Sequence, residues 1–583
     1  MRATFLAIAL LLAPSAFAAE SVPAATAATD LTGLPAGASD CLECHKAGGD
    51  GPAVTHLGDF ARSVHGQAGI GCKDCHQGYA MGPHDGEVKL DAADQAKVAK
   101  LEKARWHEEG QKEETRLSSP RTFLACQNCH DLEASAYFQS AHARFITGDS
   151  KVAGPTCETC HGPIHAIAKK LEPYVPNAQK RAVVPADRRA LQKTCEACHG
   201  NEELAREAGL NPEVRGTYHD SIHGRLVRVG NKVAPTCVSC HAGDPAKGGT
   251  HAIFAKTNPA SSVSAEQKKN TCARCHEGAT DNFANLIAHK PIQEIGGHVV
   301  PHVIHIAFSY LTTLTLLFFA FHVFIDFLYE LRQRLAAKSH GPSVDAVRSV
   351  IRFDIHQRAQ HWFMLTGVII LGITGWPLRG AGVFSGAPLI GSMDAAPYSA
   401  AFMKLFGGAE GAALWHRIGA VLIIISSLYH LFYLTFLAAQ KRLPLAMLPM
   451  PKDAIDIKDN ILFMLGLKKD RPKFDRYMYL EKFDYWAVFW GIVMMVGTGF
   501  VFWFPVFFAK FAPSWLITGV QIIHGEEATL AILFLFVVHF YNVHLKPSIF
   551  PMNWAWINGR ISVEMLKHEH PGEYEKLKDK IEK

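Results

Sequence analysis

The chain has 583 residues, of which 48% are hydrophobic, and a formal net charge of +5. This length exceeds that of one compact soluble domain and suits two or three. The positive charge is spread over segments of very different hydropathy, so it does not indicate a nucleic-acid-binding protein.

The N-terminus is typical of an export signal. Met1-Arg2 is followed by an apolar run from Phe5 to Leu12 and then by Ala16-Phe17-Ala18, the small-x-small pattern of a cleavage site. The run is too short to span a bilayer. We therefore expect residues 1–18 to be a signal peptide.

All 14 cysteines lie in Cys-x-x-Cys-His pentapeptides, the sequence that attaches c-type haem. A zinc site would not need a histidine after every second cysteine. The cysteines predicted to hold haem are Cys41, Cys44, Cys72, Cys75, Cys126, Cys129, Cys157, Cys160, Cys195, Cys198, Cys237, Cys240, Cys272 and Cys275. The proximal iron ligands are then His45, His76, His130, His161, His199, His241 and His276.

Six of these haem sites form three repeated pairs, and the seventh, Cys272–His276, stands alone. In each copy the first site is followed by Ser-x-His-(Gly/Ala), the second site and a further histidine. Low-spin electron-transfer haems take two strong axial ligands, so the repeat histidines are predicted to be the second ligands. They are His65, His84, His142, His165, His223 and His251. For the seventh haem we expect His289, His298, His302 or His305.

The region 19–295 is therefore predicted to be a periplasmic heptahaem cytochrome c domain. It is short for seven haems, so the haems must fill much of its interior, surrounded by short helices and little sheet. Enough histidines are present to close every iron, which argues against a reductase with an open haem.

Five apolar segments follow, each long enough to span a bilayer as a helix. They lie near 301–329, 359–378, 413–438, 485–508 and 514–542. The 331–360 and 439–484 loops are rich in Lys and Arg, whereas the other two connections are not, so the rich loops are expected in the cytoplasm. We expect a linking transmembrane helix at 296–335, a membrane domain at 336–550 and a cytoplasmic tail at 551–583.

Histidines inside transmembrane helices are costly and usually functional. His416 and His430 are 14 residues apart, and His524 and His539 are 15 apart. At 1.5 Å per residue each pair spans about 21–22 Å and falls within about 60° of one helix face. Two helices with this spacing would hold two stacked haems. His361 is a further ligand candidate at the start of the second segment.

The motifs around these histidines resemble the cytochrome b subunits of formate dehydrogenases and nickel–iron hydrogenases. They are Arg358–Trp362, Leu414–Gly419, Gly497–Gly499 and Ile523–Tyr541. The resemblance implies two b-type haems, one held by His416 and His524 on the periplasmic side and one by His361 and His539 on the cytoplasmic side. The chain departs from that family in the 15-residue spacing, which is 14 there, and in His430, an alternative to His361.

As a whole, the chain resembles the inner-membrane fusions of multihaem cytochrome c and dihaem cytochrome b of metal-respiring bacteria, which are quinol oxidoreductases. This implies electron flow from (mena)quinol through b haems and c haems to periplasmic cytochromes c, in anaerobic or extracellular respiration. Carboxylates at the helix ends are candidates for the quinone site: Glu526, Glu527, Asp354, Glu481 and Asp484. Arg358 and Arg417 are candidates for pairing with haem propionates.

Three alternatives remain open from the sequence. The chain could be an electron-transfer subunit without its own quinone site, a terminal reductase with one open c haem, or a protein that returns electrons to the quinone pool.

Overall fold

The computed structural model describes residues 57–75, 126–144, 154–161, 186–228, 233–242, 251–286, 299–336, 348–379, 404–443 and 445–581, with short pieces at 167, 175–176, 182–183, 231 and 289. The predicted signal peptide, the first haem site at 41–45, His76, His84, His165 and His298 lie outside these residues. The described residues fall into two compact units, one within 1–130 and 156–169 and the other within 131–155 and 170–583.

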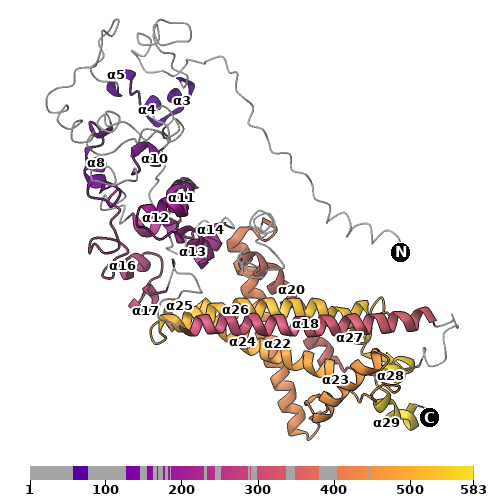
Figure 1. Ribbon diagram of the computed structural model, residues 1–583. Helices are drawn as coiled ribbons and strands as arrows, with labels where there is room; N and C mark the ends of the chain where they lie inside the picture. Colours follow the sequence, from indigo (N-terminus) through magenta and orange to yellow (C-terminus); the bar gives the residue numbers. More distant parts are fainter. Residues whose placement is uncertain are drawn as a thin grey trace. The chain divides into compact units, whose positions relative to one another are not determined.

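The expectation of a mainly helical chain with little sheet is confirmed. In the haem-motif region the helices are short (Figure 1). The first unit contains α3 (Leu57–Arg62), α4 (Val64–Gln67), α5 (Cys72–Cys75) and α10 (Cys157–His161). The second contains α8 (Asp131–Phe138), α11 (Ala186–His199), α12 (Glu202–Glu207), α13 (Val214–Asp220), α14 (Ile222–Arg228), α15 (Cys237–His241), α16 (Lys268–Ala273), α17 (Asp281–Ala284) and a two-stranded sheet of β1 (Val175–Pro176) and β2 (Ala182–Val183).

A serine cap fixes the backbone around the Ser-x-His sequence in two copies of the repeat. Ser63 Oγ donates to the Phe60 carbonyl at 2.7 Å and accepts the Gly66 N–H at 3.1 Å. Ser221 makes the same two bonds in the third copy, at 2.6 and 3.2 Å. The cap starts a short helix and places the histidine in its first turn.

Backbone hydrogen bonds join the Ser-x-His sequences of copies one and two to the next copy of the repeat. The Val64 N–H donates to the Ile167 carbonyl at 3.0 Å, and the Ala141 N–H donates to the Ile253 carbonyl at 2.7 Å. Ile167 and Ile253 occupy equivalent places, each two residues after the last histidine of its copy. The copies therefore interlock.

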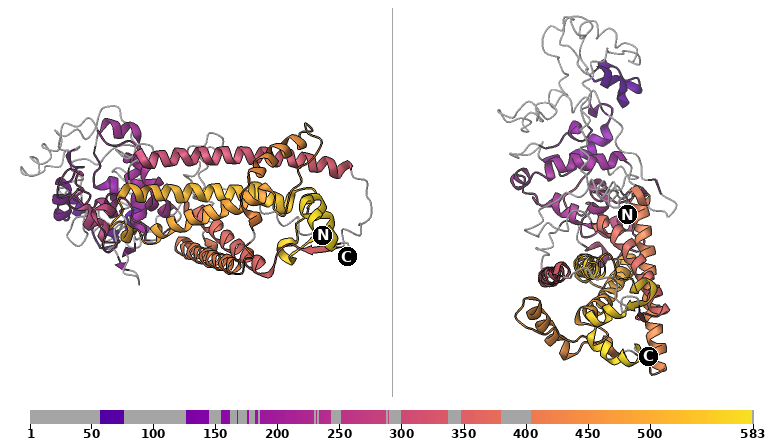
Figure 2. Two further views of the ribbon diagram at one scale, coloured as in Figure 1. Left: turned by 90° about the horizontal axis from the view of Figure 1, so that it is seen from below. Right: turned by 90° about the vertical axis from the view of Figure 1, so that its right-hand side faces the viewer.

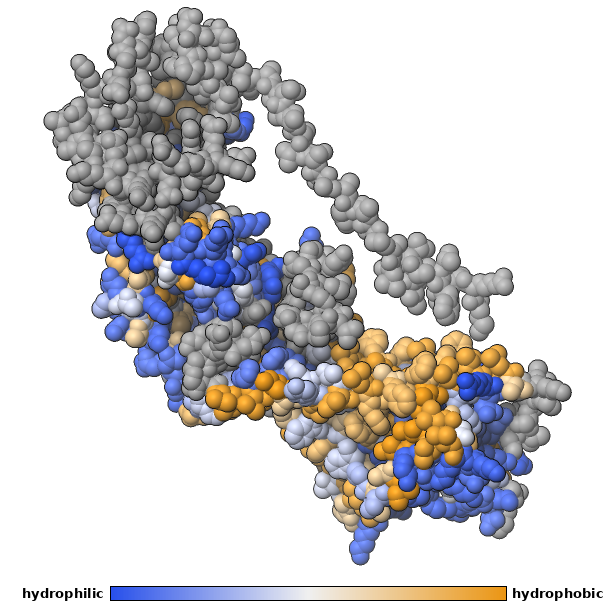
Figure 3. All heavy atoms as spheres, in the orientation of Figure 1, coloured by the Kyte–Doolittle hydropathy of each residue, from blue (hydrophilic) through white to orange (hydrophobic). Residues whose placement is uncertain are grey.

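Five of the described helices are long and apolar enough to cross a membrane, as expected. They are α18 (Val299–Ala336), α20 (Ile355–Arg379), α22 (Gly408–Ala439), α24 (Tyr479–Trp503) and α26 (Ser514–Phe534), which continues through the π-helical turns η8 (Leu535–His539) and η9 (Tyr541–Leu545). On the face seen in Figure 3, apolar side chains gather over the long helices of this bundle. Leu314, Phe432 and Phe536 are each more than 60% exposed, which suits contact with lipid.

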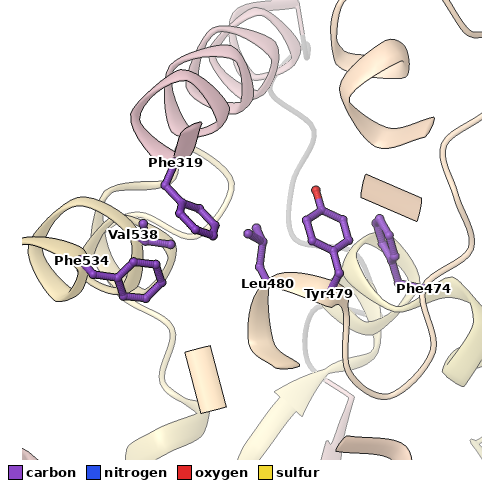
Figure 4. Packing of buried hydrophobic residues seen from close by; sticks show 6 residues of the cluster. All are labelled: Phe319, Phe474, Tyr479, Leu480, Phe534 and Val538. Carbon is purple, nitrogen blue, oxygen red and sulfur yellow. The ribbon is translucent and has the colours of Figure 1, made fainter. Parts of the chain in front are cut away.

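The bundle consists of closely packed helix groups. α18 lies along α26, and α26 also packs on α24 (Figure 2). α20 lies along α22, where Gly367 and Gly419 face each other: a Cβ on Gly419 would come within 3.2 Å of the Gly367 carbonyl oxygen. A cluster from α18, α24 and the α26–η8 helix adds apolar packing, with Phe319, Leu480, Phe534 and Val538 at its centre (Figure 4).

We call the bundle end at residues 504–513 the turn end; it includes α25 (Pro505–Phe508). At the opposite end, the tail end, β3 (Ser349–Ile351) pairs antiparallel with β4 (Arg560–Ser562). Here the buried Arg352 guanidinium donates to Glu573 at 2.7 Å and to Glu481 at 3.1 Å. The remaining elements are η6 (Lys404–Phe406), η7 (Leu445–Met447), α23 (Pro451–Met464), α27 (Ala555–Asn558), α28 (Val563–Glu569) and α29 (Pro571–Ile581).

A buried charge cluster also ties α18 to the bundle. The Lys546 ammonium group, 4% exposed as a residue, lies 3.7 Å from Asp326 and 3.6 Å from Glu330 on α18, and 3.3 Å from Glu569 on α28. Tyr541 donates a 2.8 Å hydrogen bond to Asp326. α18 is therefore joined to the other helices by ionic as well as apolar contacts.

Candidate functional site

The structure brings the predicted histidines of the repeat region together in pairs. Four pairs of rings have centroids 6.1 or 6.2 Å apart. They are His65 with His130, His142 with His199, His223 with His276, and His241 with His289.

This separation fits a metal ion held between the two rings. Imidazole nitrogens bind transition metals at about 2.0 Å, and the ring centre lies about 1.1 Å farther back, so two rings on opposite sides of one metal have centroids roughly 6.2 Å apart. Burial also lowers the pKa of His142, His223 and His241 to about 4, with smaller contributions from neighbouring cationic groups. These rings are therefore neutral at physiological pH, the state in which imidazole ligates a metal.

Each Ser-x-His histidine faces the first proximal histidine of the following copy rather than one from its own copy. His65 faces His130 and His142 faces His199. The partner of His276 is likewise His223, not one of the four downstream histidines that the sequence suggested. One of those four, His289, faces His241 instead. The backbone hydrogen bonds between copies account for the pairings of His65 and His142, because they place these two Ser-x-His sequences beside the next copy.

In the membrane helices a fifth pair lies toward the tail end. The rings of His361 on α20 and His539 on η8 have centroids 6.4 Å apart. His539 Nδ1 is hydrogen-bonded to Asp484 Oδ2 on α24 at 2.6 Å, which leaves Nε2 for a ligand. A carboxylate in this position orients a metal-binding imidazole and raises its basicity.

Several buried polar atoms near this pair have no hydrogen-bond partner. They include Nε of Arg358, one turn before His361, and Nε1 of Trp556, whose ring centroid lies 5.3 Å from that of His361. Haem propionates are acceptors that would satisfy such donors. The residues present therefore fit a haem at this pair.

His416 and His524 lie toward the turn end and have matching surroundings. His416 Nδ1 is hydrogen-bonded to Thr374 Oγ1 at 2.9 Å, and His524 Nδ1 to Thr498 Oγ1 at 2.8 Å. A glycine follows each threonine: a Cβ on Gly375 would lie 3.0 Å from His416 Cε1. Both rings are thus held at Nδ1 by a Thr-Gly sequence on the neighbouring helix.

The π-helical turn explains the unusual spacing on the last transmembrane helix. An α-helix repeats every 3.6 residues, and a π-turn adds one residue locally. η8, Leu535–His539, lies between His524 and His539. It absorbs the fifteenth residue of the spacing and allows both histidines to face the same side.

His430 is placed differently from the other membrane histidines. Its Nδ1 is hydrogen-bonded to Gln360 Oε1 at 2.8 Å, and its Nε2 to Tyr485 OH at 2.9 Å. Both ring nitrogens are therefore engaged by side chains, whereas His361 faces a second imidazole.

The five carboxylates singled out for the quinone site differ in their contacts. Asp354 caps α20 and accepts from Tyr433, Glu481 pairs with Arg352, and Asp484 holds His539. Glu526 Oε1 lies 3.6 Å from His305. Glu527 is only 4% exposed, and its Oε2 has no hydrogen-bond partner. Glu527 Oε2 and Asp484 Oδ1 are thus the two buried carboxylate oxygens among the five without a hydrogen-bond partner. Asp484 already holds His539 through its other oxygen, whereas Glu527 holds no histidine.

Sequence reasoning missed several residues that position the site. Tyr137 and Tyr218, three residues before the Ser of copies two and three, each donate to a proline carbonyl, Pro155 and Pro235. Their recurrence at equivalent places was a detectable signal. Thr374 and Thr498 were visible within the Thr-Gly sequences, but their contacts with histidines on other helices were not.

Comparison with known proteins agrees with this geometry. Residues 352–551 match the family model of prokaryotic cytochrome b561, whose members bind haem b and transfer electrons in membranes. A comparison with curated proteins finds no match. The match covers α20, α22, α24 and α26 and excludes α18. The membrane-spanning region 352–551 is therefore similar to the prokaryotic cytochrome b561 family, which is consistent with a cytochrome b fused to an N-terminal domain.

Proposed function

We propose that the chain is a quinol oxidoreductase of the bacterial cytoplasmic membrane. It takes electrons from a quinol such as menaquinol, passes them through two b haems and seven c haems, and delivers them to periplasmic cytochromes c. The N-terminal domain lies in the periplasm and the C-terminal tail in the cytoplasm, an orientation that the distribution of Lys and Arg among the loops supports.

One observation carries this proposal: paired imidazoles recur at one separation in both halves of the chain. Four pairs in the Cys-x-x-Cys-His region and one in the membrane helices have centroids 6.1 to 6.4 Å apart. A haem iron held between two such rings would carry single electrons and would have no open position for a substrate. This favours electron transfer over a terminal reductase among the described sites.

The tail-end assignment follows from the contact of His361 with His539. The turn-end assignment rests on the resemblance to the cytochrome b subunits and on the matching Thr-Gly surroundings of two histidines. His416 and His524 hold the b haem at the turn end, and His361 and His539 hold the b haem at the tail end. His430 is left out, because both of its ring nitrogens are hydrogen-bonded to side chains. The c haems are bonded to the cysteines of the seven pentapeptides.

Glu527 is the proposed proton acceptor for quinol oxidation. It lies one turn after His524 on α26, and its Oε2 is buried without a partner. Quinol oxidation releases two protons with two electrons, so a carboxylate beside the first electron acceptor is needed to remove them. At the turn end these protons leave toward the periplasm.

Two measurements on the purified full-length protein test the proposal. The pyridine haemochrome spectrum should give seven c haems and two b haems per chain, and a reduced menaquinone analogue should then reduce the b haems. Absence of b haem, in protein that has not lost cofactor during purification, would reduce the membrane domain to an anchor. Two b haems that no quinol reduces would indicate an electron-transfer subunit without its own quinone site.

Substitution of the acid tests where quinol is oxidised. Glu527→Gln keeps the size of the side chain, and we expect it to slow quinol oxidation on the order of 100-fold, the usual contribution of a positioned base. Glu481→Gln makes the same change at the tail end and should leave the rate near that of the wild type. The opposite result would move the quinone site to the tail end.

A further inference from the structure

We propose that the seventh c-haem site, at Cys272–His276, receives electrons directly from the b-haem site at the turn end and is the entrance to the c-haem chain. The inference rests on the proposed function for the identity of the two haems. It adds the place where electrons leave the membrane domain and the residues that join the two sites.

A buried contact connects the seventh site to the turn end of the bundle. Its core consists of Ala279 and Phe283 from the haem-motif region with Ala509 and Ile517 from the bundle, all less than 9% exposed. We call these four residues the junction. Ala509 is fully buried, and Gly278 also approaches the bundle, since a Cβ there would lie 3.8 Å from Val506 Cγ1.

Hydrogen bonds fix the alignment of the junction. Thr280 Oγ1 and Asn282 Nδ2 both donate to the Ala509 carbonyl, at 3.1 and 3.4 Å. Thr280 Oγ1 also accepts the Phe283 N–H at 3.2 Å as the N-cap of α17. The same side chain therefore orients Phe283 and bonds to the bundle.

On the c-haem side the junction touches the proposed iron ligand. The Phe283 ring lies 4.7 Å, centroid to centroid, from the ring of His276, and Cys272 packs against the same cluster. The opposite ligand, His223, lies on α14, which approaches α20 of the bundle. Both ligands of the seventh site thus belong to segments in contact with the membrane domain.

On the b-haem side the junction leads to His524. Val501 on α24 packs against the junction. Its neighbour Phe502 lies 5.1 Å, centroid to centroid, from the ring of His524. Packed residues therefore run from the proposed b-haem ligand His524, through 501–502 and Phe283, to the proposed c-haem ligand His276.

Continuous packing matters because electron tunnelling falls steeply with distance and is faster through packed atoms than across gaps. In the proposed step one electron would pass from the haem that His416 and His524 would hold to the haem that His223 and His276 would hold. No bond forms or breaks, and no proton crosses the junction. Two such transfers complete the oxidation of one quinol, whose two protons are released at its own site.

Rapid-mixing spectroscopy of the full-length holoprotein separates the two steps, because b and c haems absorb at different wavelengths. In Phe283→Ala we expect quinol to reduce the b haems at the wild-type rate and the c haems to follow several-fold more slowly. Phe283→Leu, which keeps an apolar side chain in the junction, should restore most of the rate. Thr280→Val, which loses only hydrogen bonds, should have a smaller effect.

Hydrogen exchange gives a readout that does not depend on electron transfer. Amides of 279–285 and 506–512 should exchange faster in Phe283→Ala than in the wild type, with haem content unchanged. If these amides exchange faster while the c haems are still reduced at the wild-type rate, the junction is not the route.

Failure of the proposed function would look different. If quinol does not reduce the b haems of the wild type, the proposed function fails, but the junction can still be tested. A chemical reductant of the b haems then replaces quinol, and the rate of electron transfer from the b haems to the c haems is measured in the same variants. A slower step in Phe283→Ala would support the junction even then, and an unchanged step would overturn it.

Discussion

The haem-motif region and the membrane bundle bring pairs of imidazoles to nearly the same separation by different means. In the haem-motif region the Ser-x-His histidines lie in short helices or turns. Serine caps in copies one and three and backbone hydrogen bonds between copies position them. In the bundle the histidines lie on long helices, and side chains of neighbouring helices hold their Nδ1 atoms.

The difference follows from the surroundings of the two regions. Short segments with little apolar core depend on local backbone geometry, so their ligands are placed by caps and turns. Transmembrane helices satisfy their own backbone groups, so only side chains remain to orient a ligand. A substitution that removes the side chain positioning a histidine should therefore lower folding stability in the haem-motif region. In the bundle it should change the binding or the redox potential of a haem.

The largest expected effect is the loss of a haem from the bundle. His524→Ala should lower the b haem content from the proposed two to one per chain, because the haem at the turn end would lose one of its two proposed ligands. His430→Ala is the matched control and should keep both b haems. A pyridine haemochrome spectrum measures both, and loss of a b haem from His430→Ala would contradict the assignment.

The next effect concerns the charge cluster that binds α18 to the bundle. Lys546→Met leaves Asp326, Glu330 and Glu569 without their shared cation, and removing one partner of a buried ionic cluster costs about 3–5 kcal/mol. We expect a lower thermal unfolding temperature in detergent. An exposed pair offers the control: Lys576→Met, which breaks a surface contact with Asp475, should change the temperature little.

The pH dependence of this cluster has a definite sign. Burial opposes ionisation of Glu569, but Lys546 and the neighbouring His568 and Arg471 hold its pKa well below the ordinary value. Its contribution to stability is therefore present above the ordinary carboxylate pKa and is lost as the pH falls toward the depressed value. In Lys546→Met this stabilisation is absent, so the gap in unfolding temperature between variant and wild type should narrow at acid pH.

A smaller effect concerns the redox potentials of the two b haems, because an aspartate holds the histidine Nδ1 at one site and a threonine at the other. Asp484→Asn removes a negative charge from the hydrogen bond to His539, which destabilises ferric iron, so the potential of the tail-end haem should rise. Thr498→Val removes only a neutral hydrogen bond from His524 and should shift the other b haem less. Redox titration of the b-haem absorbance tests both, and equal shifts would contradict the distinction.

The smallest expected effect concerns the serine caps, and the repeat supplies its own control. Ser221→Ala should cost about 1 kcal/mol of stability, the usual value of an N-cap. Ser140→Ala should cost less, because Ser140 Oγ has no hydrogen-bond partner. Chemical unfolding followed by the c-haem absorbance gives both values, and equal losses would show that the caps contribute nothing.

The residue after the histidine explains why copy two lacks the cap. Copies one and three have glycine there, and a Cβ on Gly66 or Gly224 would come within 2.2 or 2.1 Å of a carbonyl oxygen. Copy two has Ala143 at this place, so its turn must be more open. Ala143→Gly should let the cap form and make Ser140→Ala as costly as Ser221→Ala.

The sequence by itself determined the features that depend on local pattern. Cys-x-x-Cys-His defines a haem-attachment sequence within five residues, and a continuous apolar run defines a membrane helix; the five spans lie close to their expected places. The 14- and 15-residue spacings also identified the bundle histidines, because helical periodicity relates residues on one helix.

Only the tertiary structure decided which side chains meet. The pairing of His223 with His276, the two side-chain partners of His430 and the contact of Phe283 with Ala509 join residues that are far apart in the chain. The π-turn before His539 is also invisible to a fixed helical period. Such contacts depend on how copies and helices pack against one another, and local propensity and spacing carry no information about that.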